Sequence, residues 1–399
     1  MQRREFLKNT ALASGAFLIP AFLKPLEAMS MSQLSQYKNL VVIQLSGGND
    51  GLNTIVPYGN DIYYRSRKTI GIPQANVIKL NEMLGLNPAM ASLKEIYDQG
   101  SMSIINSVGY PNPDRSHFRS MDIWQTASDA DQFLSTGWIG RYLDSNCQTC
   151  QYPYDAIEVD SSLSLVMKGA TKKGIAVQNP NKLYASTRQP LFKDLVTNDH
   201  DANLNEDNLG YLYKTMIETY SSVDYIHEKS KLYNVSSVYP TNTFSNQLKT
   251  VSKFINSGLQ TRIYYVSLGG FDTHISQQHQ QNRQLKIYAD GVAAFIKDLK
   301  KTNKLDDTLV MTFSEFGRRV EQNASNGTDH GTANNVLIYG GKLKKAGIYN
   351  AAPDLATLDN GDLKYQIDFR DVYATFLDKW LNINNSQVLN KSFKGLDFI

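Results

Sequence analysis

Short apolar runs, each followed at once by a polar loop, recur along this chain and predict buried β-strands. The runs are Asn39–Leu45, Met102–Val108, Thr261–Leu268, Thr308–Phe313 and Asn335–Tyr339. Between the third and the fourth run, the apolar residues of Leu285–Leu299 follow the spacing of an amphipathic helix. A strand, a helix and a strand in this order are typical of a parallel crossover, so we expect an α/β protein.

A change of composition separates residues 179–260 from the rest. This segment is rich in Asn, Ser, Thr, Tyr and Lys, with helical stretches at Leu209–Tyr233 and Phe244–Ser257. We interpret it as a polar helical insertion in a single domain that spans residues 29–399. Its tyrosines favour packing over a platform for carbohydrate, which would need exposed aromatic faces in a row.

The length and the charge narrow the class of protein. A chain of 399 residues can form one large α/β domain with insertions or two ordinary domains, and the lack of a long linker favours one. The formal net charge is +3 and the basic residues are scattered. Nothing in this pattern indicates a nucleic-acid partner.

Residues 1–28 have the pattern of an export signal. Paired arginines in Gln2–Lys8 precede a modest apolar run, Ala11–Phe22, that a glycine and a proline interrupt. The run is too short to span a bilayer comfortably, and the pattern resembles a twin-arginine signal cleaved near Ala28. We therefore expect a periplasmic or envelope-associated protein with no transmembrane helix in the mature chain. The alternative is an uncleaved N-terminal anchor.

The only cysteines, Cys147 and Cys150, form a CQTC motif. In an oxidising compartment the pair can form a local disulfide or remain as inert thiols. A zinc site would need two further ligands, which the neighbouring residues do not supply. Redox chemistry has no other support in the sequence.

Acidic residues and histidines follow the predicted strands. Asp50 follows the first strand, Asp272 and His274 the third and Glu315 the fourth, and the next loop contains Asp329 and His330. Because the carboxyl ends of parallel strands form the ligand crevice of an open sheet, we expect these side chains to converge. Carboxylates and imidazoles bind divalent cations, here one or two ions of Zn, Mn, Mg or Ca, which polarise an ester oxygen and activate a nucleophile.

A predicted helix, Ser116–Ala127, begins after the second strand and a loop, Gly109–Arg115. Exposed backbone N–H groups at a helix N-terminus attract an anion, and a nearby arginine can clamp it. Ser116 and Arg119 are therefore candidate catalytic residues. The plainer interpretation makes Ser116 an N-cap and His117 a surface contact.

Five motifs occur in order: QLSGGNDGLNTIVPY, RSHF with DIWQT and GWIGRYLD, SLGGFDTH, SEFGR and GTDHG. Together they resemble the DUF1501 family of exported bacterial proteins, over nearly the whole mature chain. That family is regarded as related to the alkaline phosphatase–sulfatase superfamily. The resemblance implies a three-layer α/β/α sandwich of the alkaline phosphatase type, with a mostly parallel sheet and a metal site at the strand ends.

The resemblance also implies roles for single residues. Those that resemble the superfamily's metal ligands are Asp50, Asp272, His274, Glu315 and His330. Ser116 corresponds to its nucleophile by position alone. Further candidates for the site are His117, His279, Arg318 and Asp329.

Two features depart from the superfamily pattern. The later acid of the superfamily is commonly followed by histidine, whereas Glu315 is followed by Phe316, so one of two metal positions is altered or empty. Sulfatases convert a Cys or Ser in a C/S-x-P-x-R motif to formylglycine, and the nearest stretch here, PNPDR, begins with Pro111. Formylglycine-type sulfate hydrolysis is therefore disfavoured.

The sequence thus predicts an exported metal-dependent hydrolase or transferase acting on a phosphate or similar anionic ester. The alternative is a non-catalytic family member that serves as a binding or assembly partner in a cell-envelope complex. Members of the family are often encoded beside another exported family, which makes that family a partner candidate.

Overall fold

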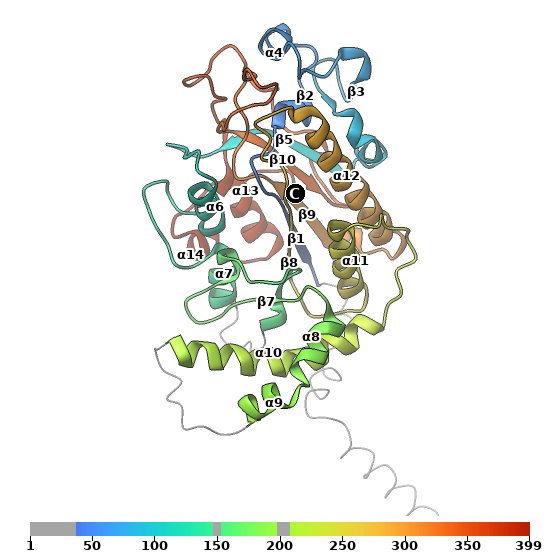
Figure 1. Ribbon diagram of the computed structural model, residues 1–399, viewed down its shortest axis with the longest axis vertical. Helices are drawn as coiled ribbons and strands as arrows, with labels where there is room; N and C mark the ends of the chain where they lie inside the picture. Colours follow the sequence, from blue (N-terminus) through green and yellow to red (C-terminus); the bar gives the residue numbers. More distant parts are fainter. Residues whose placement is uncertain (1–36, 147–152, 198–207) are drawn as a thin grey trace, which may run out of the picture. The chain divides into compact units, whose positions relative to one another are not determined.

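The strands lie where the apolar runs predict them, to within two residues at either end. The computed structural model describes residues 37–146, 153–197 and 208–399 (Figure 1). The predicted signal segment and the pair Cys147 and Cys150 lie outside the described residues. No helix in the described ranges has the length and apolar character needed to cross a membrane.

The described strands of the main sheet are β1 (Asn39–Leu45), β5 (Met102–Gly109), β6 (Ala156–Glu158), β7 (Ile175–Ala176), β8 (Ile263–Leu268), β9 (Thr308–Phe313), β10 (Asn334–Tyr339), β11 (Gly347–Ile348) and β12 (Ile367–Asp368). A small antiparallel sheet contains β2 (Ile55–Val56), β3 (Ile78–Lys79) and β4 (Gly85–Leu86).

The described α-helices are α4 (Asp61–Ser66), α5 (Lys94–Asp98), α6 (His117–Thr126), α7 (Trp138–Asn146), α8 (Pro180–Thr187), α9 (Pro190–Thr197), α10 (Asn208–Lys231), α11 (Thr243–Asn256), α12 (Gln277–Lys301), α13 (Phe369–Thr375) and α14 (Asn385–Leu389). A π-helical turn, Phe376–Trp380, continues α13.

Within the described residues the main sheet has nine strands in the order β11-β5-β10-β9-β1-β8-β6-β7, with β12 also paired to β5. The central strand β1 runs parallel to both of its neighbours, β8 and β9. Among the described strands of this sheet, only β10 runs against its neighbours. The prediction of a mostly parallel sheet is confirmed.

Alternate residues of β1 point to opposite faces of the sheet, as the pleat of a strand requires. Val41 and Ile43 belong to a buried cluster with residues of α11 and α12, whereas Leu40 and Val42 belong to a second cluster with residues of α6, α7 and α13. Figure 1 shows α11 and α12 on one side of the strands and α6, α7 and α13 on the other. This layering confirms the predicted α/β/α sandwich.

The polar segment 179–260 contributes to the core at its C-terminal end. Leu248 and Val251 of α11 are fully buried in the same cluster as Val41, so α11 belongs to the helix layer that covers the sheet. The remaining helices of the segment pack on one another. Tyr184 of α8 stacks on His227 of α10, with ring centroids 4.0 Å apart.

The loop after β1 passes very close to the loop after β8. Gly47 has a φ of 115°, and a Cβ built on it would lie 2.5 Å from the backbone nitrogen of Asp272. Only glycine allows both the positive φ and this approach of two backbones. Gly269, in the second loop, has open space around it.

Burial also changes the pKa of one carboxylate at the carboxyl end of a strand. Glu158 ends β6, and its Oε2 accepts hydrogen bonds from the backbone nitrogen and the hydroxyl of Ser164 at 2.7 and 2.9 Å. Burial raises the pKa of Glu158 to about 7. Because the folded state holds this proton more tightly than the unfolded chain does, the contribution of Glu158 to stability is complete below its ordinary pKa of 4.5 and is lost as the pH rises to about 7.

We expect Gly47→Ala to lower the free energy of unfolding by about 1–3 kcal/mol, since alanine meets both the unfavourable φ and the backbone of the neighbouring loop. Gly269→Ala is the matched control, because a Cβ built there meets no heavy atom within 4 Å. Urea unfolding followed by circular dichroism compares the two. Equal stability of both variants would contradict the close contact.

We expect Glu158→Gln to flatten the pH dependence of stability, because an amide has no proton to lose. Relative to this variant, the wild-type protein should lose free energy of unfolding between about pH 5 and about pH 8. Urea unfolding at the two pH values measures the difference. A parallel decline in both proteins would show that another group is responsible.

Candidate metal centre

The carboxyl ends of β8, β1 and β9 lie side by side. Leu45 of β1 pairs with Leu268 of β8, and Gln44 of β1 pairs with Phe313 of β9. The polar loops that follow these parallel strands therefore meet at one edge of the sheet, where α/β proteins bind their ligands.

Asp272, in the loop after β8, is the common neighbour of the other polar groups. Its Oδ1 accepts a hydrogen bond from the Arg318 guanidinium at 2.7 Å, and lies 3.0 Å from Nε2 of His274 and 3.4 Å from Nε2 of His330. Its Oδ2 lies 3.5 Å from Nε2 of His117. Burial opposes the charge of Asp272, but Arg318 and the histidines outweigh it and lower the pKa to about 2. Asp272 is therefore ionised at neutral pH.

His117, the first residue of α6, uses its two ring nitrogens differently. Its Nδ1 lies 2.9 Å from Oε1 of Glu315, and because a carboxylate accepts, we assign the ring hydrogen to Nδ1. Its Nε2 is buried and has no hydrogen-bond partner among the described residues. The hydrogen bond to Glu315 raises the pKa of His117 despite burial. The lone pair of Nε2 faces Asp272, and the carboxylates that raise this pKa also attract a cation able to displace the proton.

Glu315 is buried and fixed from behind. Its Oε1 accepts hydrogen bonds from the backbone nitrogens of Gly47 and Gly48, at 2.8 and 3.1 Å. Glu315 thus orients His117 and does not itself enter the ligand group that the structure brings together.

His330, in the loop between β9 and β10, is oriented in the same manner. Its Nδ1 lies 2.7 Å from the carbonyl oxygen of Arg115, which can only accept, so Nδ1 donates and Nε2 keeps the lone pair. Burial lowers the pKa of His330 and so favours the neutral ring. Its Nε2 lies 2.9 Å from Nε2 of His274. Two ring nitrogens at this distance either share a proton or direct both lone pairs to one cation.

His274 supplies a third imidazole beside the pair. Its Nδ1 lies 3.4 Å from Oδ1 of Asp329. A hydrogen bond from Asn323, together with His274, lowers the pKa of Asp329. Asp329 therefore serves as the outer partner of His274.

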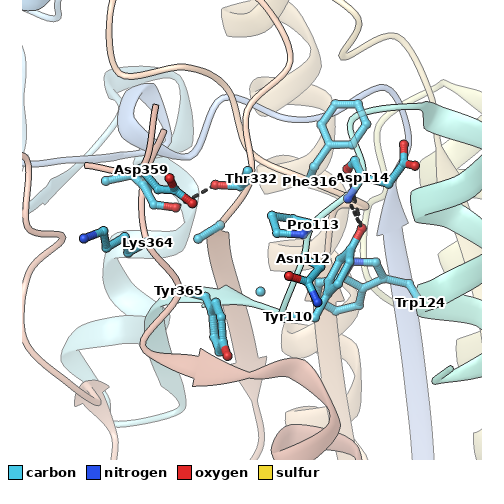
Figure 2. Close-up of a pocket in the computed structure, with 13 residues that line it drawn as sticks. Tyr110, Asn112, Pro113, Asp114, Trp124, Phe316, Thr332, Asp359, Lys364 and Tyr365 are labelled. Carbon is cyan, nitrogen blue, oxygen red and sulfur yellow. Dashed lines mark hydrogen bonds between the residues drawn. The ribbon is translucent and has the colours of Figure 1, made fainter. Parts of the chain in front are cut away.

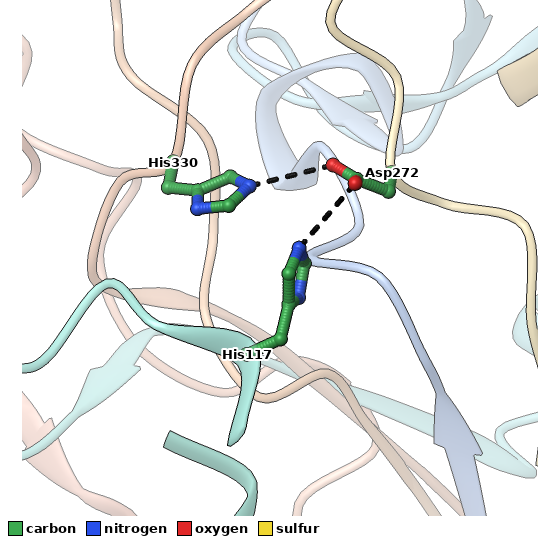
Figure 3. A group of neighbouring side chains, drawn as sticks. All are labelled: His117, Asp272 and His330. Carbon is green, nitrogen blue, oxygen red and sulfur yellow. Dashed lines mark hydrogen bonds and ion pairs between the residues drawn. The ribbon is translucent and has the colours of Figure 1, made fainter. Parts of the chain in front are cut away.

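His117, Asp272 and His330 form a group that could hold a metal ion, with ligand atoms that all lie within 4.8 Å of one another. Figure 3 shows both rings turned toward Asp272. In each ring the nitrogen remote from the centre contacts an oxygen, which is the outer-shell pattern of metal-ligating histidines. Imidazole ligands with one carboxylate fit Zn or Mn better than Mg or Ca, which prefer oxygen ligands. The residues present therefore fit the implied metal.

Phe316 occupies the space beside the two histidines. The centroid of its ring lies 4.8 Å from that of His117 and 4.7 Å from that of His330. Gly48 makes room for it, since a Cβ on Gly48 would lie 2.2 Å from the Phe316 ring. The residue after Glu315 thus forms an apolar wall beside the ligand group.

Asp50 lies at the expected strand end, but its carboxylate has other partners. It forms an ion pair with the buried guanidinium of Arg67 and accepts a hydrogen bond from Gln277. It also caps a short 3-10 helix through the backbone nitrogens of Leu52 and Asn53. The structure does not bring Asp50 into the ligand group.

The remaining predicted residues lie in three different settings. Ser116 is the exposed N-cap of α6, directly before His117, and its hydroxyl makes no capping hydrogen bond. The guanidinium of Arg119 donates to backbone carbonyls of the 129–132 segment and covers the ring of Phe133 at 3.9 Å, so it braces a loop. His279 is exposed in the first turn of α12, outside the group.

Two contributors to the centre were difficult to assign from sequence. His117 was only a further candidate, although its place at the start of a predicted helix within RSHF was the available signal. Arg115 acts through its backbone carbonyl, which every residue has, so the residue type at this position does not indicate the contact.

Solved structures with a similar arrangement share little sequence with this chain. The lipoteichoic acid synthase LtaP from Listeria monocytogenes is 11% identical with a TM-score of 0.42, covering 90% of this chain and 76% of that one. The C-terminal periplasmic domain of EcEptC from Escherichia coli is 12% identical with a TM-score of 0.40, covering 90% and 88%. A protein in the alkaline phosphatase superfamily from Vibrio parahaemolyticus is 11% identical with a TM-score of 0.40, covering 91% and 72%. With TM-scores this low, none of these likenesses bears on the chemistry of the site.

No curated protein matches this chain. A family described as a protein of unknown function, DUF1501, matches residues 226–398. This range contains the motifs SLGGFDTH, SEFGR and GTDHG, which carry Asp272, His274, Glu315 and His330. Residues 226–398 are therefore similar to the DUF1501 family, the resemblance that the motifs of the sequence led us to expect.

Proposed function

We propose that this protein is a metal-dependent hydrolase or transferase that acts on a phosphate or similar anionic ester outside the cytoplasm. The observation that carries the proposal is the convergence of His117, Asp272 and His330, with each histidine fixed through its outer nitrogen. Nε2 of His117 is buried and makes no hydrogen bond among the described residues, and the Asp272 carboxylate lies 3.5 Å from it. A divalent cation bound there would engage both groups.

His117, Asp272 and His330 would hold the ion, with His274 as a fourth ligand. When bound, a divalent cation polarises an ester oxygen and stabilises negative charge that develops on it. Zn or Mn is the cation that this ligand set favours.

Arg318 prepares the site for an anion. Its guanidinium is buried and pairs with Asp272, so the carboxylate does not leave an uncompensated negative charge where the ester would lie. The N-terminus of α6 adds backbone N–H groups, which favour an anionic group.

Ser116 remains the candidate nucleophile. Ser116 is exposed and stands in the sequence between Arg115, whose carbonyl oxygen contacts His330, and His117. Attack of the serine Oγ on the phosphorus would form a phosphoserine ester, and the serine hydroxyl would lose its proton. The bond from phosphorus to the ester oxygen would break, and the leaving alkoxide would take up a proton and depart as the alcohol. Water or a second alcohol would then accept the phosphoryl group and restore the serine. Arg119 has no part in this proposal, because its guanidinium braces the 129–132 segment.

Export through the twin-arginine route belongs to the same proposal. The support is the pattern of residues 1–28, and folded proteins travel by that route, so a metal site can be complete before export.

One observation favours the non-catalytic alternative, an assembly role in the envelope. Asp50 and Arg119, which the resemblance and the helix start suggested for the site, are engaged in internal contacts. The two experiments below separate the alternatives.

We expect wild-type protein purified without chelator to contain metal in near-stoichiometric amount, measured per chain by mass spectrometry. His330→Ala and Asp272→Ala should lose it, because each removes a ligand. Glu315→Gln should weaken metal affinity by about 10–100-fold, the usual effect of changing an outer-shell partner. His279→Ala is the matched control and should retain the metal. Retention in both ligand variants would end the assignment of the site.

We expect Ser116→Ala to keep its metal and to lose turnover of phosphate monoesters by several orders of magnitude, because no other group supplies the attacking oxygen. Ser276→Ala is the matched control, since Ser276 is also an exposed N-cap without a capping hydrogen bond. Metal content and single-turnover rates are measured on both. Full turnover in the Ser116 variant would exclude a serine nucleophile, and a metal-loaded wild type without turnover on any ester would favour the assembly role.

A further inference from the structure

A cavity of about 400 Å³ lies beside the candidate metal centre. Its apolar walls come from Tyr110, Trp124, Phe316, Leu363 and Tyr365. Figure 2 shows Tyr110 and Trp124 on one side of the space, with Asp359 and Lys364 on the opposite side and Tyr365 between them. The volume lies within the range of clefts that hold small-molecule ligands.

The cavity and the centre share a wall. Phe316 lines the cavity while its ring lies against those of His117 and His330. Asp114 also lines the cavity, and its Oδ1 accepts a hydrogen bond from the backbone nitrogen of Ser116 at 2.6 Å. A molecule whose ester group lay at the metal ligands would therefore have its remaining part next to this cavity.

The aromatic surface available to a ligand is limited. Both faces of Trp124 are covered, by Phe313 and Phe369 at centroid distances of 4.7 and 4.3 Å, so only its edge reaches the cavity. Tyr110 is buried, whereas Tyr365 is 40% exposed. One aromatic face at the mouth suits contact with one face of a single ring, and the C–H face of a pyranose is apolar enough to make it.

The polar side chains of the lining offer both donors and acceptors. Asp359 can accept, Lys364 can donate, and the amide of Asn112 can do both. All three are exposed, and a second carboxylate of the lining, Asp114, already accepts a hydrogen bond from the backbone of Ser116. Hydroxyl groups are both donors and acceptors, so a ring that carries several of them can satisfy all three. An alkyl chain would cover these polar groups without pairing them, at a cost in free energy.

The wall that carries Asp359 and Lys364 is held in place. Asp359 and Asp362 exchange two backbone hydrogen bonds of 2.9 Å, and the Thr332 hydroxyl donates to the carbonyl oxygen of Leu363 at 2.6 Å. Arg115 pairs with the buried carboxylate of Asp362. Because the wall is fixed in advance, a ligand loses little free energy in ordering it.

We propose that this cavity binds the sugar ring of a carbohydrate ester, whose anionic group lies at the metal ligands. The ester part of this statement rests on the proposed function. The ring-binding part does not, because Tyr365, Asp359, Lys364 and Asn112 belong to the cavity and not to the ligand group.

The test uses neutral methyl hexopyranosides as probes and saturation-transfer difference NMR on the full mature protein. We expect saturation of the sugar ring protons in the wild type, retained in Tyr365→Phe and about tenfold weaker in Tyr365→Ala, which loses the aromatic face. Phe133→Ala is the matched control, an exposed aromatic residue that does not line the cavity. Thermal melts verify that the variants fold, as the exposure of Tyr365 leads us to expect.

Competing probes decide the chemistry of the ligand. Phenol and hexanol are measured in the same way. Saturation of phenol or hexanol that depends on Tyr365, without saturation of any sugar, would overturn the proposal, and so would the absence of any binding that depends on Tyr365.

Removal of the metal from the wild-type protein with a chelator separates this proposal from the proposed function. A neutral sugar has no ester to place at the metal, so its binding should be the same before and after chelation. Sugar binding by a protein that never loads metal would leave the cavity assignment standing while the metal-dependent function fails. Metal loading without sugar binding would overturn the cavity assignment and leave the metal-dependent function standing.

Discussion

The buried guanidinium of Arg318 is the interaction on which the arrangement of the centre depends. Its nitrogens donate to the carbonyl oxygens of Gly47, Gly48 and Phe271 at 2.6 to 3.1 Å, to that of Thr328 at 2.9 Å, and to the side chain of Asp272. A guanidinium cannot lose its charge, so when buried it must find acceptors for its hydrogens. Here the acceptors come from the loops after β1, β8 and β9, and satisfying them fixes all three loops. The ionisation of Asp272 follows from the same contact.

The same rule explains the fate of the other strand-end acid. Asp50 is as buried as Arg318, and a buried carboxylate also needs a countercharge. Arg67 supplies it, with Gln277 and two backbone nitrogens completing the set. Asp272 differs because it is half exposed and faces histidines, so it can exchange partners with a ligand. Of these two acids at equivalent strand ends, Asp272 is therefore able to bind a ligand, whereas Asp50 is held in an internal ion pair.

The histidines show how the outer partner selects the atom that remains for a ligand. Glu315 and the carbonyl of Arg115 each hold the Nδ1 hydrogen of one ring, which leaves both Nε2 lone pairs at Asp272. Phe316 packs against both rings and closes the site on the side of the cavity. The described residues hold one cluster of possible metal ligands, and the Phe316 ring beside it also lines the neighbouring cavity.

The amino-acid sequence by itself determined the layers, the strands and the edge of the sheet at which the polar residues gather. Asn39–Leu45 and Thr308–Phe313 were predicted residue for residue, because apolar periodicity reports burial, and burial is decided locally along a strand or a helix. Only the tertiary structure decided which of those polar residues face one another. The side-chain partners of Asp50 lie 17 and 227 residues away in the chain. The Glu315 partner of His117 lies 198 residues away, and the partner of His330 is a backbone carbonyl 215 residues away. No local sequence pattern encodes contacts of this kind. The partner of a side chain at a strand end depends on which buried charge the packing of the loops places beside it, and that packing involves the whole chain.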